Sequence, residues 1–356
     1  MKIHNFSAGP SIMPQEVFEE ASNAIIEFNG GGMSLLEISH RSKPFQDVMD
    51  EAHALVFELM GLTDDYNVVF LTGGASTQFF QIPMNLLNEG DKAMYLETGV
   101  WASRAIKEAK IFGNPIIAGS SRDSNFSYIP KDIKIDNDAR YMHITSNNTI
   151  FGTQQHWWPE VEMPLVCDMS SDIFSREFPL EKFGLIYAGA QKNMGAAGTT
   201  LVVVRKDMLG HVTRTLPTMI DYRTHIDNGS MYNTPPVFPI YVSMLVMRWI
   251  KKLGGVKKME EINIAKAKLL YDEIDRNPLF RGTTAITDRS LMNVCFVMGD
   301  SSQEDAFMNL AKQNGISGIK GHRSVGGFRA SIYNAMPQSS IQVLVDLMRE
   351  FERTNG

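Results

Sequence analysis

Short runs of apolar, β-branched residues alternate with segments of helical periodicity over most of the chain, and this alternation restricts the fold most strongly. Near-continuous apolar strands separated by helices are typical of a largely parallel sheet that helices cover on both faces. We therefore expect an α/β fold. The runs predicted as strands are 68–71, 92–96, 141–145, 165–168, 185–187 and 200–204, and the segments 77–87 and 102–112 between them are predicted as helices.

Helical periodicity also marks the beginning of the chain and its last third. Near the start, a helix following Pro14 would place Val17, Ala21, Ala24, Ile25 and Phe28 on one face. Gly254 and Gly255 close a helical segment, and a long amphipathic helix is predicted over 257–276 with its charges outward and Met259, Ile262, Leu269 and Leu270 inward. A strand over 292–298, a helix over 304–315, a strand over 328–335 and a helix over 340–353 follow.

This order of elements predicts two domains. The large one would hold the mostly parallel sheet and comprise residues 15–256. The smaller one would be an α+β unit formed by residues 1–14 together with residues 257–356, a size that suits a compact domain.

Composition excludes several classes of protein. The 356 residues are 44% hydrophobic and 21% charged, which is ordinary for a globular protein and unlike a disordered chain. A formal net charge of −6 argues against a general affinity for nucleic acid or anionic lipid. Neither a signal peptide nor a run long enough to span a membrane is visible, and both Cys167 and Cys295 lie in apolar runs. We therefore expect a cytoplasmic protein with buried thiols and no membrane partner.

Lys192 is the strongest candidate for chemistry. A short apolar strand leads to it, and glycines and alanines surround it, so that backbone and side chain can approach a flat, bulky group. A lysine among apolar neighbours is less easily protonated, and its amine is then available as a nucleophile toward a carbonyl. Taken alone, the same pattern also fits a surface lysine in a flexible turn.

Two further features favour a site around this lysine. Asp168 ends an apolar run, and at the tip of a parallel strand its carboxylate would either hold a protonated ring nitrogen or cap the following turn. The segment 68–80 predicts a strand, a glycine-rich turn and a helix, whose free amides at Gly74–Thr77, with the Ser76 and Thr77 hydroxyls, would bind an anion. A phosphate cradle, an acidic ring partner and a lysine on one sheet together describe a pyridoxal 5'-phosphate (PLP) site.

Longer motifs make the assignment specific. The sequence resembles the phosphoserine aminotransferases, PLP enzymes with the aspartate aminotransferase type of fold, which implies a seven-stranded, mostly parallel sheet. The motifs that carry the resemblance are NFSAGP (5–10), EISHR (37–41), GGASTQF (73–79), Trp101, NNTI (147–150), CDMSS (167–171), YAGAQKN (187–193), NGSMYNTPP (228–236), KGHR (320–323) and GGFRASIYNAM (326–336).

The resemblance implies a role in cofactor binding for nine positions. Lys192 would form the Schiff base and then move the α-proton, Asp168 would pair with the pyridine nitrogen, and Trp101 would stack on the ring. Thr149 would approach the ring hydroxyl. Ala75, Ser76 and Gln191 would bind the cofactor phosphate, joined by Asn233 and Thr234 from the other subunit of a homodimer.

The resemblance also implies the substrates and the residues that bind them. An amino group would pass from L-glutamate to 3-phosphohydroxypyruvate, giving O-phospho-L-serine and 2-oxoglutarate, with 4-phosphohydroxy-L-threonine formation as a second activity. Arg329 would bind the α-carboxylate, a task that suits a planar guanidinium. His40 and Arg41, with His322 and Arg323, would receive the substrate phosphate or the side-chain carboxylate of glutamate, although any single arginine could equally be a solvated surface charge.

Two positions depart from a pattern seen in some members of the family. Ala8 stands where these carry a small hydroxyl residue, and Ser76 where these carry an arginine that helps to bind the substrate phosphate. Phosphate recognition would therefore depend more on His322 and Arg323.

Other activities remain open. A serine– or alanine–glyoxylate aminotransferase, a cysteine desulfurase, or a non-catalytic dimer that binds a phosphorylated metabolite would share the fold. Neither cysteine lies in a glycine-rich loop, which counts against the desulfurase. The histidine and cysteine spacings give no support for a metal site.

Overall fold

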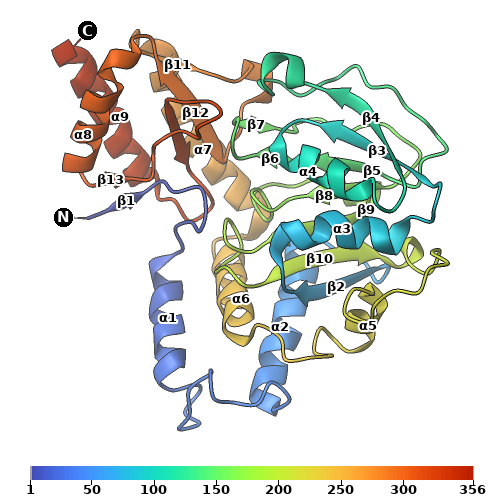
Figure 1. Ribbon diagram of the computed structural model, residues 1–356. Helices are drawn as coiled ribbons and strands as arrows, with labels where there is room; N and C mark the ends of the chain where they lie inside the picture. The colour runs from blue at the N-terminus through green and yellow to red at the C-terminus, as the bar shows by residue number, and fades with distance from the viewer. Residues whose placement is uncertain (1, 356) are drawn as a thin grey trace.

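The computed structural model describes residues 2–355, and its centre is a sheet with helices on both faces (Figure 1). Among the described residues this sheet has seven strands, and β10 is the one that runs antiparallel to its neighbours. The predicted α/β class and the mostly parallel seven-stranded sheet are therefore confirmed. In spatial order the strands are β2 (Tyr66–Leu71), β10 (Thr200–Arg205), β9 (Phe183–Gly189), β8 (Leu165–Asp168), β5 (Met142–Thr145), β3 (Lys92–Glu97) and β4 (Asn114–Ser120).

The edge strand β4 was not predicted from the sequence. It begins with Asn114 and Pro115, and most of its side chains are only partly buried. A strand at the edge of a sheet needs no continuous apolar run, because one of its sides has no neighbouring strand. The hydrophobic pattern used for the six other strands therefore could not find it.

Alternate residues of the strands pack against two separate helical layers. Val68 and Phe70 belong to the core under α1 (Gln15–Ile26), α2 (Lys43–Met60) and α6 (Val237–Lys252). Val69 and Leu71 face the opposite core, which contains side chains of α3 (Gly74–Leu86), α4 (Val100–Ala109) and α5 (Tyr222–Asp227). Because successive side chains of a strand point to opposite faces, one apolar run serves both layers.

One residue of the predicted apolar face of the first helix is misplaced. Val17, Ala21 and Ala24 are buried as expected, whereas Ile25 is 42% exposed and its neighbour Ile26 is 77% exposed. The helical turn brings Ile25 past the edge of the contact with α6. An apolar surface is therefore left open at this end of α1.

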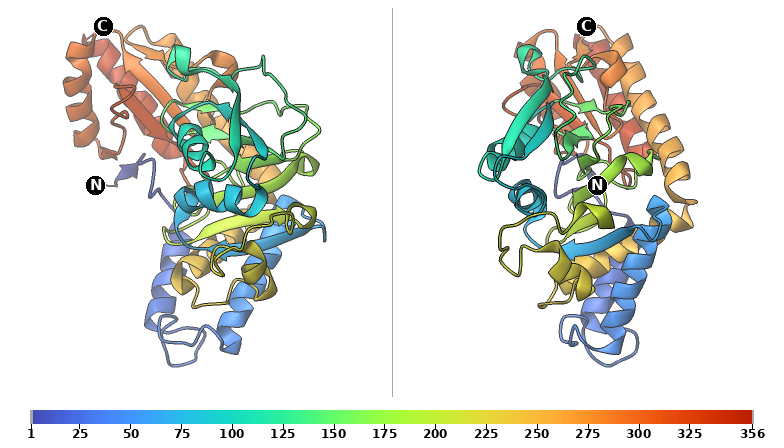
Figure 2. Two further views of the ribbon diagram at one scale, coloured as in Figure 1. Left: turned by 45° about the vertical axis from the view of Figure 1, so that its right-hand side comes forward. Right: turned by 90° about the vertical axis from the view of Figure 1, so that its right-hand side faces the viewer.

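A second core lies in the last third of the chain (Figure 2). Its sheet, three-stranded among the described residues, consists of β11 (Phe280–Gly282), β12 (Asn293–Met298) and β14 (Phe328–Ser331). Three helices pack on it: α7 (Gly255–Arg276), α8 (Glu304–Gln313) and α9 (Gln338–Asn355). The predicted strand 328–335 is thus shorter than expected.

The first residues of the chain lie beside this second core. β1 (His4–Asn5) pairs in parallel with β13 (Ile316–Ser317), as Figure 1 shows at the upper left. The predicted division into domains stays a prediction, and residues 1 and 356 at the two ends of the smaller domain lie outside the described residues. Short elements complete the fold: β6 (Asn147–Asn148), β7 (Thr153–Gln154) and 3₁₀ helices at Arg122–Ser124, Leu180–Lys182, Lys206–Met208, Ile286–Asp288 and Ser301–Gln303.

The prediction that α7 carries its charges outward is wrong at two positions. Lys266 is fully buried, and its Nζ donates to the carbonyls of Ile332, Tyr333 and Asn334 at 3.1, 2.7 and 3.3 Å. Glu273 is also buried and accepts from arginines of α7 and α9. Such partners come from distant parts of the chain, so helical periodicity alone does not reveal them.

Both cysteines are free and buried, Cys167 in β8 and Cys295 in β12, as expected. None of the helices in residues 2–355 combines the length and the apolar character needed to cross a membrane.

Candidate active site

The predicted site residues gather at one edge of the central sheet. Strands β2, β3, β5, β8 and β9 run in one direction, so the loops after their carboxyl ends meet there. A cavity of about 520 Å³ opens at this edge. Ten predicted residues line it: Ala75, Ser76, Trp101, Thr149, Asp168, Gln191, Lys192, His322, Arg323 and Arg329.

Lys192 enters this cavity three residues after the end of β9. Its Nζ lies 5.6 Å from the centroid of the Trp101 ring. Its backbone carbonyl accepts a hydrogen bond from the Ser11 hydroxyl, which fixes the segment from the other side. Burial lowers the pKa of Lys192, and the nearby Asp168 carboxylate opposes this shift only in part. A larger share of the amine is therefore unprotonated than in a lysine exposed to water.

Asp168, at the tip of β8, caps the following turn, and its pairing with a ring nitrogen stays a prediction. Its Oδ1 accepts from the Ser170 amide at 2.9 Å, which caps the turn that follows. The side chain is buried and also lines the cavity with Lys192. The pKa of Asp168 is raised because the carboxyl group is buried. The charge of Lys192 and the hydrogen bonds from Ser170 offset only part of this rise. A cation at this position would favour the ionised carboxylate.

A chain of hydrogen bonds joins the aromatic wall of the cavity to Arg329 on β14. Trp101 Nε1 donates to Thr149 Oγ1 at 3.2 Å, and Arg329 Nη1 donates to the Thr149 carbonyl at 2.9 Å. Among the described residues, the buried Nε of Arg329 has no hydrogen-bond partner. The guanidinium is thus held in place with donors to spare, as a carboxylate clamp requires.

The glycine-rich turn places the start of α3 at the cavity, but fewer of its residues line the cavity than predicted. Ala75 and Ser76 line the cavity. Thr77 does not, and its amide already donates to the Gly73 carbonyl at 3.4 Å. Of the residues predicted for the anion site, Gly74, Ala75 and Ser76 therefore line this cavity, whereas Thr77 lines another one.

Four predicted residues are not brought to Lys192 within one chain. Asn233 and Thr234 are exposed and line a separate cavity of about 200 Å³ beside Gly73. His40 and Arg41 lie between α1 and α2, where Arg41 Nε contacts His40 Nε2 at 3.4 Å. Their predicted roles stay predictions.

The structure adds lining residues that the sequence analysis did not name. Arg104 follows Trp101 by one turn of α4, and its guanidinium carbon lies 5.0 Å from the Trp101 centroid. Residues three apart lie on the same face of a helix, so the position of Arg104 beside Trp101 could have been predicted from the sequence. Gly9 packs beside Lys192, where an added Cβ would meet Lys192 Cγ at 3.5 Å. No sequence signal connects residue 9 with residue 192.

Asn193 connects the lysine segment to the second core. Its Oδ1 accepts from the Asn334 amide at 3.0 Å, and its Nδ2 donates to the Ser171 carbonyl at 3.2 Å. The lysine is therefore held between β8, the N-terminal segment and the chain that follows β14.

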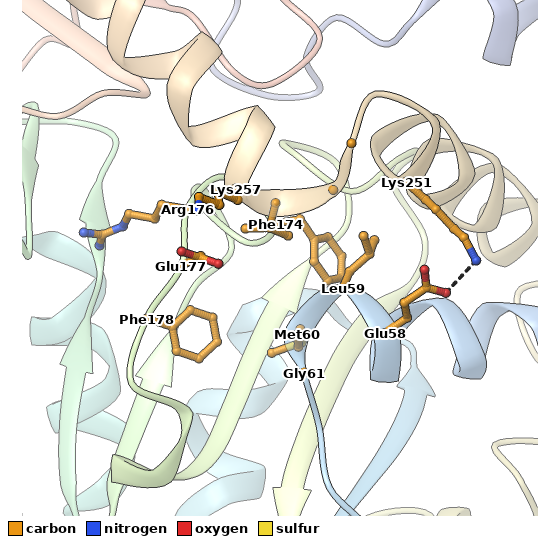
Figure 3. Close-up of a pocket in the computed structure, with 13 residues that line it drawn as sticks. Glu58, Leu59, Met60, Gly61, Phe174, Arg176, Glu177, Phe178, Lys251 and Lys257 are labelled. Carbon is orange, nitrogen blue, oxygen red and sulfur yellow. Dashed lines mark hydrogen bonds and ion pairs between the residues drawn. The ribbon is translucent and has the colours of Figure 1, made fainter.

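A larger cavity, of about 650 Å³, lies where α2, α6 and α7 approach one another (Figure 3). Two of its basic residues, Lys251 and Arg176, are already paired with carboxylates. Lys251 Nζ lies 2.6 Å from Glu58 Oε2, and Arg176, whose guanidinium points away from the other labelled residues, lies 3.1 Å from Asp172 Oδ2. The cavity around Lys192 is the better candidate, because it combines an amine, an aromatic ring and free cationic donors.

Comparisons with known proteins agree with this geometry. The family model for aminotransferase class-V matches residues 3–344. The chain is 60% identical to the phosphoserine aminotransferase of Flavobacterium johnsoniae over 353 residues, 99% of either chain.

Solved structures give the same result. The phosphoserine aminotransferase of Bacillus circulans subsp. alkalophilus has a TM-score of 0.97 at 46% identity, covering 100% of this chain and 99% of its own. The PLP-bound enzyme of Trichomonas vaginalis has a TM-score of 0.93 at 37% identity, covering 98% of this chain and 100% of its own. The chain therefore belongs to the class-V aminotransferases and, within them, to the phosphoserine aminotransferase family.

Proposed function

We propose that this chain is a PLP-dependent transaminase that transfers an amino group from L-glutamate to 3-phosphohydroxypyruvate. The products are O-phospho-L-serine and 2-oxoglutarate. The observation that carries the proposal is that one cavity is lined by Lys192, the Trp101 ring, the buried Asp168 and Arg329, with Lys192 Nζ 5.6 Å from the Trp101 centroid. An amine, a ring-stacking surface and an acidic partner for a ring nitrogen are the groups that PLP chemistry uses.

The residues around the cavity fit the cofactor. PLP, when bound, supplies an electron sink for the bonds at the substrate's α-carbon. Asp168 would hold the ring nitrogen, Trp101 would cover one face of the ring, and Thr149 would approach the ring hydroxyl. The amides of Ala75 and Ser76 at the start of α3, with Gln191, would hold the phosphate, because the amide groups of a helix N-terminus attract anions.

Different side chains of the cavity act on different parts of the substrate. Arg329 binds the α-carboxylate with the donors that Thr149 leaves free. Lys192, with its lowered pKa, would move a proton between the substrate's α-carbon and C4′ of the cofactor, in opposite directions in the two half-reactions. Asp168 stays ionised while a protonated ring nitrogen is beside it. His322 and Arg323 receive the distal phosphate or carboxylate.

A second copy of the chain completes the site in this proposal. Asn233 and Thr234 reach the cofactor phosphate, and His40 and Arg41 reach the substrate phosphate, only if another subunit supplies them. Exposed apolar side chains of α1 and the segment after it support a homodimer. They are Phe18, Ile25, Ile26, Met33 and Leu36.

Two finer points belong to the same proposal. The phosphorylated keto acid that is one carbon longer, and that leads to 4-phosphohydroxy-L-threonine, is a secondary substrate. We also propose a cytoplasmic location, which the two buried free thiols support.

An absorbance experiment tests the function. Purified enzyme should show the visible band of PLP attached to Lys192, L-glutamate should bleach this band, and 3-phosphohydroxypyruvate should restore it. A band that ignores glutamate would contradict the proposal and favour another PLP enzyme of this fold, such as a glyoxylate aminotransferase. A protein that binds phosphorylated metabolites without any band would instead be a non-catalytic dimer.

Replacement of the lysine tests its role. Lys192→Ala should abolish turnover while the protein keeps its oligomeric state and melting temperature, because the side chain enters the cavity rather than the core. Lys206→Ala, which removes an exposed lysine from the end of β10, is the matched control and should keep normal rates. Residual turnover near the wild-type rate in Lys192→Ala would contradict the assignment.

A further inference from the structure

The arginines that line the Lys192 cavity differ from most other arginines of the molecule. Arg122, Arg176, Arg248, Arg276 and Arg289 each lie beside a carboxylate. Within residues 2–355, the three cavity arginines, Arg104, Arg323 and Arg329, form no ion pair with a carboxylate. The cavity therefore offers excess positive charge in a chain whose net charge is −6, and this excess suits a ligand with several negative charges.

The proposed function assigns no role to Arg104. It is exposed, lines the cavity, and comes from α4 rather than from the loop that carries His322 and Arg323. Its guanidinium carbon lies 5.0 Å from the centroid of the Trp101 ring, and Lys192 Nζ lies 5.6 Å from the same centroid. An arginine that stacks on an aromatic ring keeps the edge donors of its guanidinium available for an anion.

We propose that Arg104 binds the phosphate of the phosphorylated substrate and contributes to the discrimination between phosphate and carboxylate at that end of the substrate. This inference rests on the proposed function. Ser76 brings no positive charge to the cavity from the start of α3, whereas Arg104 supplies a guanidinium to the same cavity from α4, the next helix.

The charge of the ligand explains why binding of a phosphate group should depend on Arg104 more than binding of a carboxylate does. Arg329 takes the α-carboxylate that both substrates share. The other end is one carboxylate charge in glutamate but about 1.5 to 2 charges in a phosphate monoester at neutral pH. A third oxygen and the additional charge need another donor group beyond His322 and Arg323, and charge-assisted hydrogen bonds to arginine provide it.

Binding of unreactive analogues tests the proposal separately from catalysis. 3-Phosphoglycerate carries the carboxylate and the phosphate but no amino or keto group, and glutarate carries two carboxylates. In titration calorimetry with the PLP-loaded protein, Arg104→Gln should raise the dissociation constant of 3-phosphoglycerate roughly 10- to 100-fold, as the loss of hydrogen bonds to a charged group implies. The dissociation constant of glutarate should change less than about threefold.

Two further variants make the test specific. Lys107→Gln removes an exposed positive charge from the next turn of α4, outside the cavity lining, and should leave both dissociation constants unchanged. Arg104→Lys keeps the charge but not the planar fork, and should recover only part of the affinity for 3-phosphoglycerate. In steady-state kinetics, Arg104→Gln should raise KM for 3-phosphohydroxypyruvate and leave KM for glutamate nearly unchanged.

Two outcomes would overturn the proposal, and a third would overturn only the proposed function. Equal losses for both analogues, with a shifted cofactor band, would mean that Arg104 only supports Trp101. Unchanged binding of 3-phosphoglycerate in Arg104→Gln would mean that Arg104 has no contact with the phosphate. If the wild type binds 3-phosphoglycerate with the predicted dependence on Arg104 but transfers no amino group, the proposed function fails while this binding role stands.

Discussion

Lys192 and Lys266 show that a pKa lowered by burial can accompany different roles. Burial lowers the pKa of both Lys192 and Lys266, the latter to about 7. The ammonium of Lys266 has three carbonyl acceptors, which belong to the three residues after β14. Within the described residues Lys192 Nζ has no hydrogen-bond acceptor and faces Trp101 and Asp168. Only Lys192 is therefore free to react, and Lys266 is a structural cross-link.

Lys266 should make stability depend on pH. Its pKa is lower in the folded state than in the unfolded chain, so the unfolded state binds more protons between about pH 7 and pH 10.5, and the free energy of unfolding rises with pH in this range. From pH 7 to pH 9 the wild type should gain about 2 kcal/mol relative to Lys266→Met. Urea unfolding of both proteins at the two pH values measures the difference. Parallel pH profiles would contradict the lowered pKa.

At the scale of secondary-structure elements, the proposed anion site depends on the start of α3. Gly73 has φ +94°, and a Cβ at this position would lie 1.9 Å from Thr77 Oγ1 and 2.8 Å from Thr77 Cβ. The turn therefore needs glycine both for its backbone conformation and for the close approach of Thr77. Ala75 and Ser76 are presented to the cavity by this turn.

Gly73→Ala should consequently weaken cofactor binding. The matched control is Gly90→Ala, because Gly90 also has a positive φ, of +87°, but no atom within 4 Å of an added Cβ. Both variants should lose about 1–2 kcal/mol of stability from backbone strain. Only Gly73→Ala should release PLP on dialysis, since only there must the helix start move. Equal PLP retention by the two variants would show that the turn does not control the phosphate site.

At the scale of the whole molecule, the site combines parts of the chain that are far apart. β1 and the segment after it lie beside the second core and reach Lys192 through Gly9 and Ser11. We propose that residues 1–14 and 257–356 form one structural unit, which the separate second core supports. Asn193 and Asn334 join this unit directly to the lysine segment.

The proposed homodimer predicts complementation between inactive variants. Lys192→Ala and Arg41→Ala should each show little activity at low 3-phosphohydroxypyruvate concentration. After unfolding and refolding together, half of the randomly formed dimers are mixed, and one of their two sites then has an intact lysine and an intact Arg41. The mixture should regain about a quarter of the wild-type activity. No recovery in confirmed mixed dimers would place Arg41 in the same subunit as Lys192.

Much of the fold and part of the site could be predicted from the sequence alone. The six apolar strands, the helices other than α2 and α5, and the cavity residues Lys192 and Asp168 depend on local patterns: apolar runs, helical spacing and a strand that ends in a polar residue. Trp101 was expected only from the family resemblance. In a parallel sheet, residues that follow strand ends share one edge, so this part of the site follows from order along the chain.

The tertiary structure decided the rest, because each remaining feature depends on contacts between distant segments. Burial of Lys266 depends on carbonyls that lie 66 to 68 residues further along the chain. The edge strand β4 is held by its neighbour β3 rather than by its own pattern. The folded chain places four of the predicted site residues away from its own Lys192, namely His40, Arg41, Asn233 and Thr234. Local sequence patterns show which surfaces are apolar. The partners of buried charges, and the residues that one subunit would supply to another, are set only when the whole chain packs.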